Sequence, residues 1–127
     1  MDSDPKTISD LAIKSVLNTL KYLGSEIDFY ISSFDFSETS CLDGFERIIS
    51  ICHVIGGDIY INSSGGAQLY NHNDFEKGNL NLKFLIPQIP RYSQFDNDFI
   101  SGLSIIDVLM FNDKDQVNEM MLTHVLE

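Results

Sequence analysis

The sequence has few basic residues and no long hydrophobic run. Eight lysines and arginines stand against 19 aspartates and glutamates, so the formal net charge is −11. A negative field of this size repels the phosphates of nucleic acids and anionic lipids, which argues against nucleic-acid partners. No apolar stretch approaches the ~20 residues that a membrane-spanning helix needs. The acidic first residues are also unlike a secretory signal. We therefore expect a soluble, cytoplasmic protein without membrane insertion.

Cysteine and histidine are scarce as well. Cys41 and Cys52 are interpreted as free thiols, because disulfides are rare in the cytosol and Cys52 lies in an apolar segment. A disulfide between them is the alternative. The three histidines have no zinc-ligand spacing with either cysteine, so no metal site is expected. No motif identifies a cofactor, which stays unknown.

What is present is ordinary globular composition. The chain has 127 residues, of which 43% are hydrophobic and 21% charged. That length favours one domain with a sizeable core. We expect residues 1–6 to be a disordered tail and residues 7–127 to form a single α/β domain.

Hydrophobic spacing and turn residues predict helices and strands in alternation. Thr7 and Asp10 have the spacing of a capping box, and Gly24 is a natural helix end. The expected helices lie between Thr7 and Gly24 and over 43–55, 67–70, 104–111 and 114–126. The expected strands cover 27–31, 58–62 and 82–86, with loops over 32–40, 71–74, 77–79 and 91–102.

This order favours a small three-stranded parallel sheet with helices on both faces. Strands that alternate with helices are joined by right-handed crossovers, which make neighbouring strands parallel. Three strands are fewer than the usual four to six or so. The sheet is therefore expected to be part of a larger one.

A polar, glycine-rich turn follows the second expected strand. Asn62 and two serines precede Gly65 and Gly66, at the point where a short helix is expected to begin. Ligands gather beyond the carboxyl ends of parallel strands, and glycine lets an anion approach backbone N–H groups. The alternative is a turn whose glycines serve backbone geometry alone, since no phosphate-loop lysine accompanies them.

Asp107 lies in an otherwise apolar helix that Ser104 is expected to cap. The spacing of these two residues matches a capping box with aspartate in place of glutamate, which is a structural explanation. A carboxylate among apolar residues needs a partner, so Asp107 is alternatively a ligand-binding group or a base. Arg47 is the only cation of the helix over 43–55. It is expected either to grip an anion or to make a bridge within the protein.

Two segments carry a family resemblance. Ile59–Tyr70 (IYINSSGGAQLY) and Leu103–Asn112 (LSIIDVLMFN) resemble the WbqC-like family. Residues 82–85, 92–94 and 43–55 fit the same pattern, and the resemblance covers about residues 8–125. The family's turn usually carries proline where this chain has Ser63. Its first half, with a Gln-Pro-Tyr turn, has no counterpart here, so the chain resembles the carboxyl-terminal half of a larger Rossmann-like fold.

The resemblance implies a role in building bacterial surface polysaccharide such as O-antigen. The implied reaction is acyl or aminoacyl transfer to a nucleotide-linked amino sugar, by a transferase that needs the missing half. The expected partners are a nucleotide-sugar ligand and either a second copy or a chain that supplies that half. The alternative is a non-catalytic interaction domain. We assign Ser104 and Asp107 to catalysis, and ligand binding to Tyr60, Asn62, Gly65, Gly66, Tyr70 and Arg47.

Overall fold

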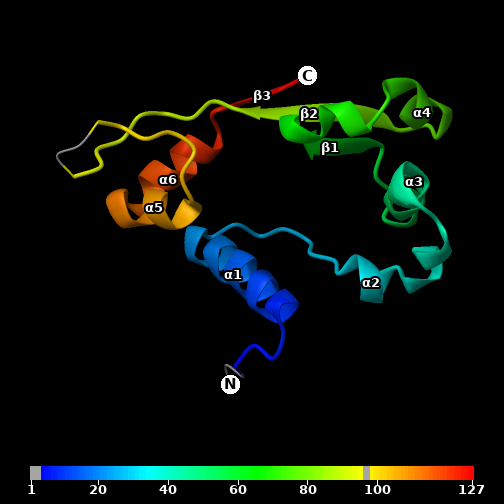
Figure 1. Ribbon diagram of the computed structural model, residues 1–127, viewed down its shortest axis with the longest axis horizontal. Coiled ribbons are helices and arrows are strands. Elements are labelled where there is room, and N and C mark those ends of the chain that lie inside the picture. The colour runs from blue at the N-terminus through cyan, green and yellow to red at the C-terminus, as the bar shows by residue number, and fades with distance from the viewer. Residues whose placement is uncertain (1–3, 96–97) are drawn as a thin grey trace. The chain divides into compact units, whose positions relative to one another are not determined.

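Figure 1 shows the computed structural model, which describes residues 4–95 and 98–127. The chain forms two compact units: Met1–Asp28 with Ile89–Leu122, and Phe29–Gln88 with Thr123–Glu127. We call them the helical unit and the sheet unit. No helix of the described residues is long and apolar enough to cross a membrane. The expectation of a single domain over 7–127 stays a prediction.

The helical unit contains α1 (Ile8–Leu23), α5 (Ile105–Phe111) and α6 (Lys114–Met121). The predicted capping box at Thr7 is confirmed, and Gly24 ends α1 with φ 77°, in the left-handed region that favours glycine. Leu23 and Val117 are buried in this unit. The Asn118 side chain donates to the Leu23 carbonyl at 3.1 Å. The end of α1 is thereby held against α6.

The sheet unit is built around three strands. Strands β1 (Ile59–Ser63) and β2 (Asn81–Pro87) are parallel, and β3 (His124–Leu126) pairs with β2 in the antiparallel sense. The order is β1-β2-β3 (Figure 1). The remaining elements are α2 (Ser32–Asp35), η1 (Ser37–Cys41), α3 (Gly44–Val54), η2 (Ser64–Leu69) and α4 (His72–Lys77), in which η marks a 3₁₀ helix.

The core of the sheet unit lies between β2 and the helices α3 and α4. Cys52, Phe75, Leu80 and Leu82 are buried together, and Phe75 is completely inaccessible. Both cysteines are free thiols, as predicted, and Cys52 is one of the buried core residues. Burial raises the pKa of its thiol, since the charged form would lose solvation.

Several sequence predictions are confirmed. The first helix, the helix after Asp43 and the strands over 58–62 and 82–86 are all present. The expected short helix is present as η2, although it begins at Ser64 and so includes Gly65 and Gly66 of the expected turn. Residues 1–3 of the expected tail, and residues 96–97 of the expected loop over 91–102, lie outside the described residues.

Other predictions are wrong. Residues 27–31 form no strand: Ile27, Phe29 and Tyr30 are between 40% and 62% exposed, and the stretch crosses from one unit to the other. The expected loop over 32–40 contains α2 and part of η1. The expected turn over 71–74 is the start of α4, because Asn71 caps a helix: its side chain accepts from the Asn73 N–H at 3.0 Å. Of the expected turn over 77–79, Lys77 ends α4, whereas Gly78 and Asn79 do form a turn.

The predicted all-parallel sheet is also wrong. We expected the last helix to run to about residue 126, but α6 ends at Met121 and β3 follows. The last residues turn back beside β2, where Phe84 and Glu127 exchange backbone hydrogen bonds of 2.7 and 3.1 Å. The sheet is therefore mixed. Coverage of both faces by helices and membership of a larger Rossmann-like fold stay predictions.

Candidate functional site

Asp107 is held by side chains from the loop that precedes its helix. The Tyr92 hydroxyl donates to Asp107 Oδ2 at 2.6 Å, and Gln94 Nε2 donates to the same oxygen at 3.0 Å. Hydrogen bonds to an ionised acceptor are shorter and stronger than neutral ones. The cluster of Tyr92, Gln94 and Asp107 therefore fixes one carboxylate oxygen.

Gln94 is the centre of this cluster. It is 7% exposed, one of two buried polar residues among those described. Its Nε2 also donates to the Tyr92 hydroxyl and the Ile100 carbonyl, each at 3.1 Å. Its Oε1 accepts from the Ile100 N–H at 2.7 Å. Both ends of the amide are satisfied, so Gln94 locks the loop onto α5.

The other carboxylate oxygen of Asp107 is open. Within the described residues Asp107 Oδ1 has no hydrogen-bond partner, and no buried side-chain oxygen or nitrogen lacks one. Because Asp107 is half-buried, Oδ1 must reach solvent. A carboxylate with one fixed oxygen and one open oxygen is ready to accept a hydrogen bond from a ligand.

The hydrogen bond to Asp107 also acts on Tyr92. It raises the pKa of the phenol, with a smaller contribution from burial, because ionising the hydroxyl would remove the bond and place two negative charges together. Tyr92 is thereby kept as a donor. Its ring packs edge-on against Phe99, with centroids 5.2 Å apart.

Asp107 lines an open groove, which we call the Asp107 groove. Its volume is about 650 Å³, within the size range of small-molecule sites. Ser104 contributes a hydroxyl, and no lysine or arginine lines it. The rest of the lining is apolar and comes from Phe95, Leu103, Ile106, Met110 and Phe111.

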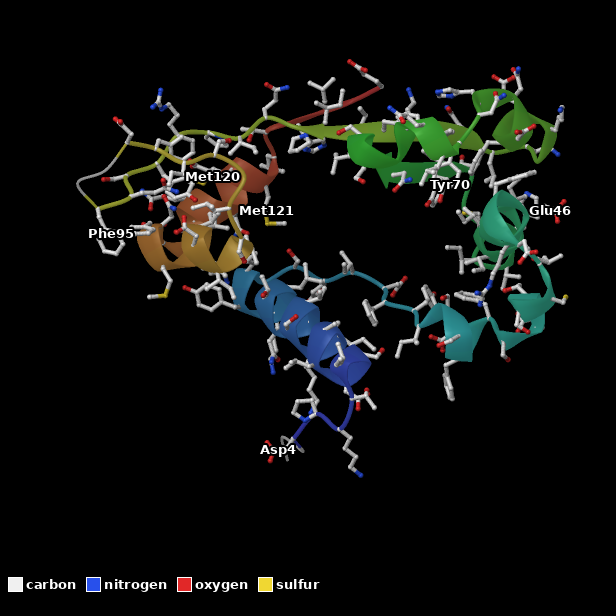
Figure 2. The ribbon with its side chains drawn as sticks, viewed as in Figure 1. Asp4, Glu46, Tyr70, Phe95, Met120 and Met121 are labelled. Carbon is white, nitrogen blue, oxygen red and sulfur yellow. The ribbon has the colours of Figure 1, made fainter. Side chains whose placement is uncertain are left out.

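Phe95 forms an unusual wall of this groove. Its backbone has φ 49°, a left-handed conformation that is rare for a bulky residue. The Phe95 ring, labelled in Figure 2, is 80% exposed. It packs edge-on against Phe111, with centroids 4.6 Å apart. Such strained positions are concentrated at binding sites. An aromatic ring held in solvent beside a carboxylate is a natural ligand contact.

Ser104 caps α5, as predicted, but its partnership with Asp107 was predicted wrongly. Ser104 Oγ accepts from the Ile106 N–H at 3.2 Å. The Asp107 carboxylate does not complete a capping box, because it is engaged by Tyr92 and Gln94. The capping-box explanation for Asp107 is therefore wrong. The alternative, a ligand-binding group or a base, stays a prediction.

The residues of the glycine-rich turn lie in the sheet unit. The Asn62 side chain accepts from the Ser63 N–H at 2.9 Å. Its amide nitrogen lies only 2.6 Å from where a β-carbon on Gly66 would be, whereas nothing lies within 4 Å of that position at Gly65. The space beside Gly66 is thus filled by Asn62. The anion-binding role of this turn stays a prediction.

The other predicted binding residues are largely engaged within the protein. Tyr60 and Tyr70 pack edge-on at 6.1 Å and both lie against Phe75 (Figure 2 labels Tyr70). Arg47 donates to Thr39 Oγ1 and to the Ser32 carbonyl, each at 3.1 Å. Arg47 therefore makes the bridge within the protein that was one of its two interpretations. Ligand binding by these three residues stays a prediction.

Sequence reasoning assigned no role to Tyr92 and Gln94. They entered only as part of the family pattern, because side chains on an irregular loop have no periodicity to show where they point. A signal was present: an apolar helix with one carboxylate requires polar partners, and Tyr92 and Gln94 stand in the loop just before it.

A polar cluster that holds one carboxylate beside an apolar groove defines this α/β chain as a candidate small-molecule-binding protein. A family model described as the WbqC-like protein family matches residues 1–119, so the chain belongs to that family. The predicted family is thereby confirmed. Comparisons with curated proteins and with solved structures find no match.

Proposed function

We propose that the Asp107 groove binds the amine of an amino sugar and that the chain serves in acyl or aminoacyl transfer to a nucleotide-linked amino sugar. The observation that supports this function is the open Oδ1 of Asp107, presented at an apolar groove without any cationic lining residue. A carboxylate in such surroundings favours an ammonium or amine donor over an anion. The resemblance to the WbqC-like family supports a role for this chemistry in building bacterial surface polysaccharide.

The chemistry assigns a role to each polar side chain. Asp107 accepts a hydrogen bond from the amine, and Tyr92 and Gln94 fix the orientation of its carboxylate. As the amine nitrogen bonds to the acyl carbon, the bond from that carbon to the leaving group breaks. Asp107 takes the amine proton and returns it to the leaving group. The Ser104 hydroxyl, which has no acceptor for its own proton within the described residues, donates to the substrate.

Binding of a nucleotide-linked amino sugar tests this function. Titration calorimetry compares that ligand with the same sugar carrying a hydroxyl in place of the amine. Asp107→Asn should weaken binding of the amino sugar tenfold or more, because a hydrogen bond to a charged group contributes about 1.5–3 kcal/mol. The control, Asp98→Asn, removes one charge from the nearby loop and should leave affinity unchanged. Equal affinity of Asp107→Asn and wild type would refute the role of Asp107.

A second candidate function is supported by the edge of the sheet. In the part of the chain that the structure describes, β1 pairs only with β2, so its other edge is open. Ile59 and Ile61 on that strand are each 49% exposed. Open strand edges pair with other chains unless they are protected. We infer a self-association or partner-binding role, for which sedimentation of wild type and Ile61→Lys is the test. A wild-type monomer at high concentration would exclude self-association.

A further inference from the structure

A second hollow adjoins the Asp107 groove. It lies between α1 and the start of α5 and has a volume of about 340 Å³. We call it the α1–α5 hollow. Ser104 and Ile106 line both cavities, so the two meet at the first turn of α5. Ser104 therefore stands at the boundary between the two cavities.

The lining of the hollow is uncharged and mostly hydrocarbon. Val16, Leu20 and Ile105 supply apolar side chains, and no lysine, arginine, aspartate or glutamate lines it. The hydroxyl groups of Ser15 and Thr19 already donate hydrogen bonds within α1. Ser15 donates to the Ala12 carbonyl at 2.8 Å, and Thr19 donates to the Ser15 carbonyl at 2.9 Å. The hollow thus offers no charged partner to a ligand.

We propose that the α1–α5 hollow binds the aliphatic chain of an activated acyl thioester, the donor for an amine held at Asp107. The inference rests on the proposed function, and it decides whether the group transferred to the amine is an acyl group or an aminoacyl group. An aminoacyl group would bring an ammonium into a hollow without a carboxylate, where a buried charge lacks a partner. An acyl chain buries apolar surface there without that penalty.

The position of Ser104 fits this arrangement. With the chain in the hollow and the amine at Asp107, the thioester carbonyl lies where the two cavities meet, next to Ser104. The amine nitrogen then bonds to the carbonyl carbon, the carbon–sulfur bond breaks, and the thiol leaves with the proton. No oxidant or further reactant is required.

The experiment uses the whole chain and a series of N-acetylcysteamine thioesters from acetyl to hexanoyl. These probes are neutral, so the net charge of −11 does not repel them. In wild type the dissociation constant should fall about fourfold for each added methylene, which corresponds to ~0.8 kcal/mol. An alanyl thioester should bind more weakly than a propionyl thioester. Methyl NMR signals of Val16 and Ile105 should shift as the series is titrated.

Two variants of α1 supply the comparison, one at a residue that lines the hollow and one at an exposed neighbour. Thr19→Phe fills the hollow and should abolish the chain-length dependence, whereas Asn18→Phe adds the same ring beside the hollow and should keep it. Ser15→Leu gives a second filling variant if Thr19→Phe folds poorly. The proposal would be overturned if the affinity of wild type did not change with chain length. It would also be overturned if Thr19→Phe and Ser15→Leu both kept the chain-length dependence of wild type.

The outcomes separate the two proposals. Thr19→Phe should leave amino-sugar affinity unchanged, because Thr19 does not line the Asp107 groove. Asp107→Asn should weaken amino-sugar binding and keep the chain-length dependence. A chain-length dependence without amino-sugar binding would retain the acyl hollow and reject the proposed function. Amino-sugar binding without a chain-length dependence would reject the acyl-chain proposal and retain the proposed function.

Discussion

Gln94 shows how one buried side chain can organise a candidate site. Both ends of its amide are used, and its partners come from the loop, the loop backbone and α5. A buried donor or acceptor that loses its partner costs about 1–3 kcal/mol. The stability of the helical unit and the orientation of Asp107 therefore depend on the same residue.

Replacing Gln94 by methionine tests this dependence without leaving a cavity. Gln94→Met keeps the length of the side chain but removes every hydrogen bond, leaving the Ile100 N–H without its acceptor. The free energy of unfolding in urea should fall by about 1–3 kcal/mol. The exposed Gln88→Met is the control and should change it by less than about 0.5 kcal/mol. Equal stability of the two variants would contradict the role of Gln94.

The raised pKa of Tyr60 predicts that the protein loses stability at alkaline pH. Burial and the neighbouring Tyr70 raise its pKa from 10.0 to about 12. A raised folded-state pKa means that the folded protein holds the proton more tightly than the unfolded chain does. The stabilisation is therefore complete below pH 10 and is lost as the pH rises towards 12.

The measurement is urea unfolding of wild type and Tyr60→Phe between pH 9 and 12, a range set by the reference pKa of tyrosine near 10. The wild-type free energy of unfolding should fall more steeply across this range than that of Tyr60→Phe. Tyr22→Phe, on the exposed surface of α1, should keep the wild-type slope. Parallel slopes for wild type and Tyr60→Phe would show that Tyr60 is not the titrating group.

The sequence identified part of the candidate site for a sound physical reason. The pattern of a carboxylate and a helix cap in an otherwise apolar segment indicates Asp107 and Ser104. Tyr92 and Gln94 reach Asp107 across 15 and 13 residues of chain. Contacts from an irregular loop depend on its tertiary path, which local patterns do not encode.

At the scale of elements, strong hydrophobic patterns were predicted well and context-dependent ones were not. β1 and β2 combine β-favouring residues with flanking turns, and both were found. The stretch over 27–31 has the same composition but gains no neighbouring strand. β3 was missed because helical spacing continues past Met121, although pairing with β2 decides the conformation there.

The pairing of β3 can be tested with two proline substitutions. Phe84 and Glu127 exchange hydrogen bonds, so the alternation of an antiparallel ladder makes Ile86 and Val125 the next hydrogen-bonded pair. Val125→Pro removes a donor from the ladder, whereas Leu126→Pro removes an N–H that points away from β2. Amide hydrogen exchange at Ile86 should accelerate more in Val125→Pro. The same acceleration in both variants would contradict the observed register.

At the scale of the whole molecule, the family match covers parts of both the helical unit and the sheet unit. The matched residues 1–119 include α1, α5 and all but the last two residues of α6 in the helical unit. They also include β1 and β2 of the sheet unit. β3 lies beyond the matched residues. The candidate site lies wholly in the helical unit, so its tests do not depend on how the two units are arranged.

The charge of the whole chain gives the last prediction. A net charge of −11 destabilises the folded state by self-repulsion. The exposed ion pair between Lys77 and Asp74, at 3.4 Å, opposes it, but such pairs contribute little. Raising salt from about 0.01 to 0.15 M shortens the screening length from about 30 to 8 Å. Screening should therefore weaken repulsion more than attraction, and the Tm should rise.

Thermal melts at pH 7 across this range of NaCl measure the effect. A double variant, Glu26→Gln with Asp115→Asn, removes two exposed negative charges and should gain less from added salt than wild type does. The range stays at low salt, where screening dominates over the exclusion of ions from the protein surface. A wild-type Tm that stays constant or falls between these concentrations would show that local attractions outweigh the overall repulsion.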